Sequence, residues 1–141
     1  MPRLALSHVL IGAAAALAAP PAAATIMTYE CHVRHTDARE VIQPLIFIAH
    51  DDDDDRVVVS DAAILGFNAG QPVEGRLVVE NDARVTVAWE VDMRIGSRTV
   101  TMRYRATVVK GSHAFNVVAQ PKGYSNIFSR GGRCVVKKLS E

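Results

Sequence analysis

The strongest constraint on the fold is an alternation of apolar and polar residues that runs through residues 84–119. Apolar residues occupy every second position from Val85 to Met93 and again from Val100 to Val108. A period of two is typical of a β-strand with one buried face, whereas an amphipathic helix repeats roughly every 3.6 residues. This part of the chain is therefore predicted to consist of antiparallel strands joined by short turns.

The turn between the first two of these strands sets their register. Gly96-Ser97 fits a two-residue type II′ turn, because glycine is favoured at its first central position. Counting back from this turn places Trp89 opposite Tyr104 on the apolar face and Glu90 opposite Arg103 on the polar face. A slip of one residue would mix the two faces, so the turn and the hydrophobic pattern support the same pairing.

Two further turns extend the meander. Gly111-Ser112 is predicted to form a second two-residue turn, which places Val108 opposite Phe115. A three-residue loop between Glu80 and Arg84 would place those two residues opposite each other. Together the three turns predict four consecutive antiparallel strands.

The remaining predicted strands are short apolar segments, at residues 27–33, 41–49, 56–60 and 133–139. Pro44 indicates a bulge or an edge near the start of the second segment. Residues 61–72 are expected to hold one helical turn or an irregular loop. The fold class is thus all-β, a small antiparallel meander closed into a barrel of about 7–8 strands, with a β-sandwich as the alternative. Closure is favoured because it removes exposed strand edges.

Two cysteines, Cys31 and Cys134, lie near the two ends of the strand-forming region. Cys31 falls on the apolar face of its strand, and the pair Gly131-Gly132 just before Cys134 is interpreted as a hinge. A disulfide between the cysteines would join the first strand to the last, and two unpaired thiols are the alternative. Because disulfides persist mainly outside the cytosol, the pair favours an oxidising compartment.

The first part of the chain is predicted to be a secretory signal peptide, residues 1–24, followed by a single barrel-like domain, residues 25–141. A nearly continuous apolar run extends from Val9 to Ala19, and small residues up to Ala24 form a cleavage site. After cleavage near Ala24 the protein is expected to be secreted or periplasmic, with no transmembrane segment in the mature chain. An uncleaved N-terminal anchor is the alternative.

The net charge indicates which kind of partner to expect. The chain has 16 basic and 15 acidic residues, and one basic residue, Arg3, belongs to the predicted signal peptide. The mature chain is therefore neutral, whereas proteins that bind nucleic acid usually carry a basic excess. The expected partner is a protein or a cell-envelope component, and no nucleic acid.

One long connection is the best candidate for a binding loop. Residues 120–133 are rich in glycine and contain two aromatic residues, and long loops of this kind often carry binding function. The candidate binding residues are Tyr124, Asn126, Phe128 and Arg130. The alternative is a structural crossover that covers one end of the barrel.

Trp89 and Tyr104 allow two interpretations. In a filled barrel they are core residues, and in a barrel with a cavity they would line it and stack on a ligand. The second interpretation would make the protein a carrier of a small apolar ligand.

Candidates for metal binding are weak, and no metal or other cofactor is expected. Asp51, Asp53 and Asp55 belong to a run of five aspartates, but the run lacks the spacing and the glycine of a calcium loop, so a solvated hairpin tip is favoured. His32 falls on the polar face of its strand and His35 lies at or past the strand's end, so the two need not converge. The chain also has no catalytic motif such as G-x-S-x-G, and we expect a protein that is not an enzyme.

A distant resemblance rests on two short motifs. Tyr29 and Cys31 near the start, with Gly132 and Cys134 near the end, resemble the pattern of the periplasmic inhibitors of C-type lysozyme. Those proteins are small disulfide-linked β-barrels, so the resemblance implies a barrel and, as one alternative, lysozyme inhibition. The leading hypothesis from the residues is a non-catalytic secreted β-domain that binds a protein or an envelope component through its loops.

Overall fold

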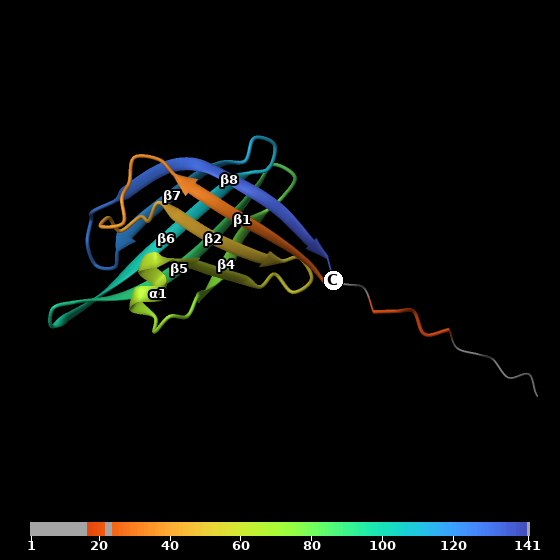
Figure 1. Ribbon diagram of the computed structural model, residues 1–141, viewed down its shortest axis with the longest axis horizontal. Coiled ribbons are helices and arrows are strands. Elements are labelled where there is room, and N and C mark those ends of the chain that lie inside the picture. The colour runs from red at the N-terminus through yellow and green to blue at the C-terminus, as the bar shows by residue number, and fades with distance from the viewer. Residues whose placement is uncertain (1–16, 22–23, 141) are drawn as a thin grey trace, which may run out of the picture.

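The computed structural model describes residues 17–21 and 24–140, and within them the chain forms eight strands and one short helix. In chain order the elements are β1 (Thr25–Val33), β2 (Leu45–Asp51), β3 (Val57–Asp61), α1 (Ala62–Phe67), β4 (Val73–Glu80), β5 (Arg84–Ile95), β6 (Arg98–Val109), β7 (Ala114–Pro121) and β8 (Phe128–Ser140). Each strand pairs with the next and β8 pairs with β1, which closes an antiparallel barrel (Figure 1). The predicted all-β meander closed into a barrel is confirmed, and the sandwich alternative is wrong.

Most of the predicted signal peptide lies outside the described residues. Its described part consists of residues 17–21, which are exposed, and Ala24, which is half-buried directly before β1. Among the described residues, the structure contains no helix that combines the length and the apolar character needed to cross a membrane.

The register predicted for the central hairpin is confirmed. Trp89 lies opposite Tyr104, and Glu90 lies opposite Arg103, whose Nε is 3.2 Å from the Glu90 Oε1 atom. Gly96 has a φ of 62°, the left-handed value that a type II′ turn needs at its first central residue. The alternation of side chains therefore continues without interruption through β5 and β6.

The other two predicted turns need correction. Glu80 lies opposite Val85 rather than Arg84, because a bulge interrupts β4 and the Asn81 side chain accepts hydrogen bonds from the backbone of Ala83 and Arg84. The second predicted turn, at Gly111-Ser112, is also longer than two residues.

The β6–β7 connection spans residues 110–113. His113 takes a left-handed φ of 59° and its amide donates to the Val109 carbonyl at 2.8 Å. The predicted pairing of Val108 with Phe115 nevertheless holds. For this connection, the turn residues therefore predicted the register correctly but the turn type wrongly.

Two strand boundaries also differ from the prediction. β2 begins at Leu45 rather than at Val41, because Pro44 has no backbone N–H to donate to a ladder. β8 begins at Phe128 rather than at Arg133, since it pairs with β7 from its first residue. Gly131-Gly132 therefore lies inside a strand, and its interpretation as a hinge is wrong.

The interior of the barrel is filled by the inward-facing side chains of the eight strands. Two residues outside the strands complete it: Ile42, from the β1–β2 connection, and Ile64, from α1, are each 1% exposed. Helix α1 is oriented by Asp61, whose Oδ1 atom accepts a hydrogen bond from the Ile64 amide at 2.7 Å. Burial raises the pKa of Asp61.

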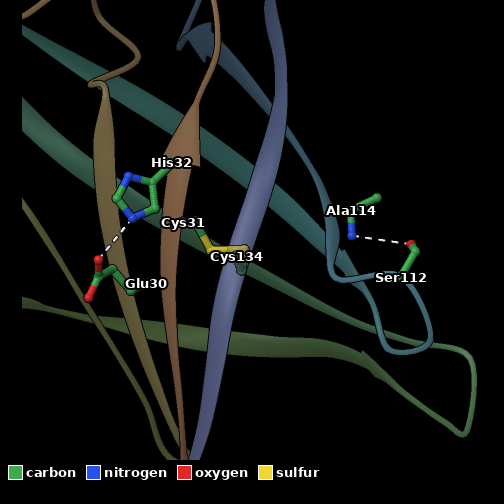
Figure 2. The surroundings of a disulfide bond; sticks show 6 residues. All are labelled: Glu30, Cys31, His32, Ser112, Ala114 and Cys134. Atoms are coloured by element: carbon green, nitrogen blue, oxygen red, sulfur yellow. Dashed lines mark hydrogen bonds and ion pairs between the residues drawn. A yellow bond between two sulfur atoms is a disulfide. The ribbon is translucent and has the colours of Figure 1, made fainter.

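The predicted disulfide closes the barrel. Cys31 on β1 lies directly opposite Cys134 on β8, and the two form a disulfide bond (Figure 2). Both cysteines are buried, as expected for Cys31 on the apolar face. The bond thus connects the first and last strands at a point 103 residues apart in the sequence.

A glycine next to this disulfide permits the close approach of the same two strands. A Cβ atom added at Gly132 would lie 2.0 Å from the backbone oxygen of His32. No side-chain movement can relieve this clash, because the oxygen belongs to the backbone. At the neighbouring Gly131 the nearest atom would be the Arg34 Nη2, at 3.5 Å. Of these two positions, only position 132 therefore requires glycine for steric reasons.

We predict that replacing both Cys31 and Cys134 by alanine lowers the free energy of unfolding. In the chain-entropy model a crosslink over about 100 residues contributes about 4–5 kcal/mol, and measured effects are often smaller. Urea denaturation followed by tryptophan fluorescence measures the change, and the reduced parent protein should unfold at a similarly low urea concentration. Unchanged stability in both would show that strand pairing alone closes the barrel.

We also predict that Gly132→Ala destabilises the protein by about 1–3 kcal/mol, because β1 and β8 must move apart to admit the methyl group. Gly131→Ala is the matched control and should change stability by no more than about 0.5 kcal/mol. Thermal unfolding by circular dichroism compares the two variants. Equal effects would contradict the assignment of the close contact to Gly132.

Candidate functional site

The connections of an antiparallel barrel divide between its two ends, because successive strands run in opposite directions. The β1–β2 connection, helix α1, the β5–β6 turn and the β7–β8 loop all follow odd-numbered strands and lie at one end (Figure 1). We call this the α1 end. It contains the longest connections of the described chain, residues 34–44, 62–72 and 122–127.

An apolar groove of about 360 Å³ lies at the α1 end between the β1–β2 connection, α1 and the end of β5. Its polar rim is formed by Arg39, Glu40 and Gln43. Two of its apolar side chains are strongly exposed, Phe67 at 45% and Ile95 at 64%. Its apolar surface is formed by Ala38, Val41, Ala62, Ala63, Phe67, Met93 and Ile95.

Helix α1 explains why the groove is apolar. Ile64 points into the barrel and is buried, whereas Phe67 at the end of the helix is 45% exposed and lines the groove with Ala62 and Ala63. Leu65, the residue after Ile64, is 40% exposed but does not line the groove. The exposed side chains therefore remain available at the surface.

The β7–β8 loop adds further exposed apolar side chains to the α1 end. Tyr124 is 55% exposed and Ile127 is 65% exposed, and the predicted residue Asn126 lies exposed between them. The amide of Lys122 donates to the Thr101 carbonyl at 2.8 Å, which places the start of the loop beside β6. Ile127 was not among the predicted binding residues, although it is an isolated apolar residue in a polar loop.

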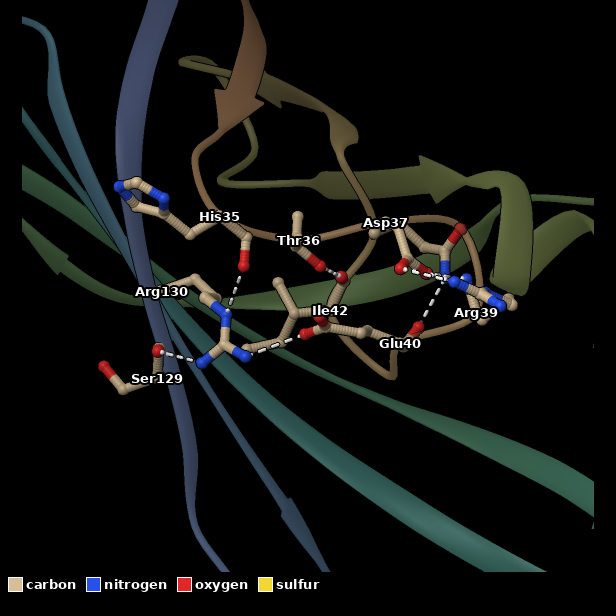
Figure 3. A network of polar contacts seen from close by, with 9 residues as sticks. His35, Thr36, Asp37, Arg39, Glu40, Ile42, Ser129 and Arg130 are labelled. Carbon is tan, nitrogen blue, oxygen red and sulfur yellow. Dashed lines mark hydrogen bonds and ion pairs between the residues drawn. The ribbon is translucent and has the colours of Figure 1, made fainter.

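Phe128 and Arg130 were predicted to be loop residues, but both belong to β8. Arg130 instead joins β8 to the β1–β2 connection (Figure 3). Its Nε atom donates to the His35 carbonyl at 3.0 Å, and its Nη2 atom lies 2.8 Å from the Glu40 Oε2 atom. Arg130 thus supports one wall of the groove rather than a mobile loop.

Polar contacts within the β1–β2 connection hold the same wall in place. Gln43 is 3% exposed and its amide nitrogen donates to the carbonyls of Ala38 and Glu40, at 3.3 and 2.6 Å. The hydroxyl of Thr36 donates to the Ile42 carbonyl. Buried polar groups with satisfied hydrogen bonds favour one conformation, so this wall of the groove is preformed.

Trp89 and Tyr104 belong to the core of the barrel. Each is 3% exposed, and their rings stack with centroids 5.1 Å apart. The Tyr104 hydroxyl donates to the Val41 carbonyl at 2.7 Å, and burial raises its pKa. A hollow of about 290 Å³ has both residues in its lining, but its other residues, Ala88 and three charged ones, lie on the outer face of the sheet.

The five metal candidates do not converge. The Nε2 atom of His32 lies 2.8 Å from the Glu30 Oε1 atom, and His35 lies past the end of β1. The carboxylate of Asp51 accepts a hydrogen bond from the Asp53 amide at 3.0 Å within the β2–β3 turn. Asp55 lies in the same turn, near the imidazole of His50. Across the part of the chain that the structure describes, no three His, Cys, Asp or Glu side chains are placed to hold a metal ion.

Comparison with protein-family models, with curated proteins and with solved structures found no match for this chain. The resemblance to periplasmic lysozyme inhibitors therefore rests on the two short motifs and on the barrel architecture. The site must be interpreted from its own geometry, since architecture alone does not identify a function.

We predict that Arg130→Ala loosens the β1–β2 connection without unfolding the barrel. Because Arg130 and Glu40 are partly exposed, the loss in unfolding free energy should be about 1 kcal/mol or less. Hydrogen exchange should be faster in residues 35–43 and unchanged in β5 and β6. Glu40→Gln is the control, since it removes the charge but keeps an acceptor, and it should have a smaller effect. Unchanged exchange in both variants would contradict this role of Arg130.

Proposed function

We propose that this chain is an exported, non-catalytic β-barrel that binds a protein partner through the groove at its α1 end. Export is supported by the disulfide and by the predicted signal peptide, because structural disulfides are rare in the reducing cytosol. A component of the cell envelope would meet such a protein in the same compartment.

The observation that carries the proposal is the concentration of exposed apolar side chains at one end. Phe67, Ile95, Tyr124 and Ile127 are each between 45% and 65% exposed, and all four lie on or beside the connections of that end. Of the four, Phe67 and Ile95 share one groove, and contiguous exposed apolar surface with a polar rim is typical of interaction sites in soluble proteins. Because the wall formed by the β1–β2 connection is preformed, a partner would not have to order that wall on binding.

The chemistry of the groove favours binding over catalysis. Of its three polar rim residues, Glu40 is paired with Arg130 and Gln43 is bonded to backbone carbonyls. Arg39 pairs with Asp37 at 3.2 Å on the solvent side, and its side chain remains 92% exposed. An apolar side chain of a partner would fill the groove, and a polar or acidic group beside it would contact Arg39.

We predict that the double variant Phe67→Ser, Ile95→Ser loses its partner while it keeps its fold. The immobilised mature protein is incubated with an envelope fraction and, separately, with purified C-type lysozyme, the probe suggested by the sequence resemblance. Val109→Ser is the matched control, because Val109 is 42% exposed but is the last residue of the even-numbered strand β6, at the opposite end.

A protein captured by the parent and by the control, but not by the double variant, would support the proposal. The captured protein should then bind the double variant at least about tenfold more weakly than it binds the parent, which is the loss expected when two interface anchors are truncated. Capture that is equal in all three proteins, or no capture from any source, would contradict it. Lysozyme inhibition that survives the double variant would assign inhibition to another surface.

A further inference from the structure

The end of the barrel opposite the α1 end contains a hollow of about 250 Å³. We call it the mouth. Its apolar walls are Met27, Val108 and Val136, which face the barrel axis from β1, β6 and β8. Tyr29 also lines it, and the polar groups around it are Asp52, Glu80, Lys110 and His113. Four strands and two turns thus surround one cavity.

Tyr29 supplies a buried polar group in the mouth. The residue is only 4% exposed, and its ring is part of the cavity lining. Burial and the nearby carboxylates of Glu80 and Asp52 raise the pKa of its hydroxyl to about 12. The hydroxyl therefore stays neutral at physiological pH, and the two acidic residues Asp52 and Glu80 line the same cavity.

A buried histidine positions one of these carboxylates. His50 is 2% exposed, and its Nδ1 atom lies 3.4 Å from the Asp52 Oδ1 atom. The Nε2 atom of His50 is 3.7 Å from the Asp55 Oδ1 atom and has no hydrogen-bond partner among the described residues. Contact with the imidazole keeps Asp52, a member of the five-aspartate turn, at the rim of the mouth rather than in free solvent.

The residues in and around the mouth carry an excess of negative charge. Glu80 and Lys110 form an ion pair and compensate each other. Asp52 is left without a cationic Lys or Arg partner among the described residues, and Asp51, Asp53, Asp54 and Asp55 adjoin it in the sequence. A negative cavity with apolar walls favours a cation that carries an apolar body.

We infer that the mouth binds a small primary amine, with the ammonium group between Asp52 and the Tyr29 hydroxyl and the apolar body against Met27, Val108 and Val136. The ammonium would donate to the Asp52 carboxylate and to the phenolic oxygen, which accept such bonds. Drug-sized ligands occupy cavities of roughly 300–1,000 Å³, so this smaller cavity fits an amine of the size of phenethylamine. The inference is independent of the protein-binding groove at the other end.

Isothermal titration calorimetry of the mature protein with phenethylamine tests the inference, and 2-phenylethanol is the matched neutral ligand. The amine should bind and the alcohol should bind at least about tenfold more weakly, since it lacks the charged donor. A lysine analogue with blocked backbone ends distinguishes a free amine from the lysine side chain of a protein. The tighter of the two amines identifies the source, and binding of either supports the site.

Two variants and one control locate the binding. Asp52→Asn should weaken phenethylamine binding at least about tenfold, and Tyr29→Phe should weaken it several-fold without removing the ring. Asp53→Asn removes the same charge from the same turn but not from the cavity lining, and it should change the affinity by less than about twofold. Thermal unfolding of each variant confirms that it is folded.

Three results would overturn the inference. The first is the absence of amine binding at millimolar concentration, and the second is equal binding of the amine and the alcohol. The third is an equal loss of affinity in Asp52→Asn and Asp53→Asn, which would mean that the acidic turn attracts cations without a defined site. None of these results bears on the groove at the α1 end, because no variant used here lies there.

Discussion

The pairing of β1 with β8 is the contact on which the rest of the structure depends. It closes the sheet, and it is held by the Cys31–Cys134 disulfide at the position where the two strands lie opposite each other. Gly132 allows the backbones to approach closely beside that bond. Once the sheet is closed, every strand has two neighbours, and the barrel has two ends but no free edge.

Closure also separates the two candidate sites. Because the interior is filled by stacked aromatic and aliphatic side chains, a ligand cannot pass through the barrel, and binding is limited to the ends and the outer surface. The α1 end presents a large apolar groove with a rigid wall, which suits a macromolecular partner. The mouth presents a smaller cavity with an excess of acidic groups, which suits a small cation. The two ends therefore have different chemistry in one small fold.

Sequence reasoning was most accurate where neighbouring residues control the structure. The type II′ turn at Gly96 and the alternation around it predicted the β5–β6 register correctly. It failed where a distant strand decides the outcome. Arg130 looked like a loop residue because of the glycines beside it, but pairing with β7 extends β8 through that segment. The Gly131-Gly132 pair was interpreted as a hinge, whereas the role of Gly132 is to allow the close approach of β1.

The candidate sites show the same division. The sequence determined the fold class, the inward position of Cys31 and the buried faces of the strands, because side chains of a strand alternate and turns fix register locally. Only the tertiary structure brought Phe67 beside Ile95 in one groove, and Tyr29 beside Asp52 and Glu80 in one mouth. Their sequence separations are large, and nothing in the local pattern records which connections meet. That is decided when β8 joins β1, since closure alone sets which turns share an end and how near they lie.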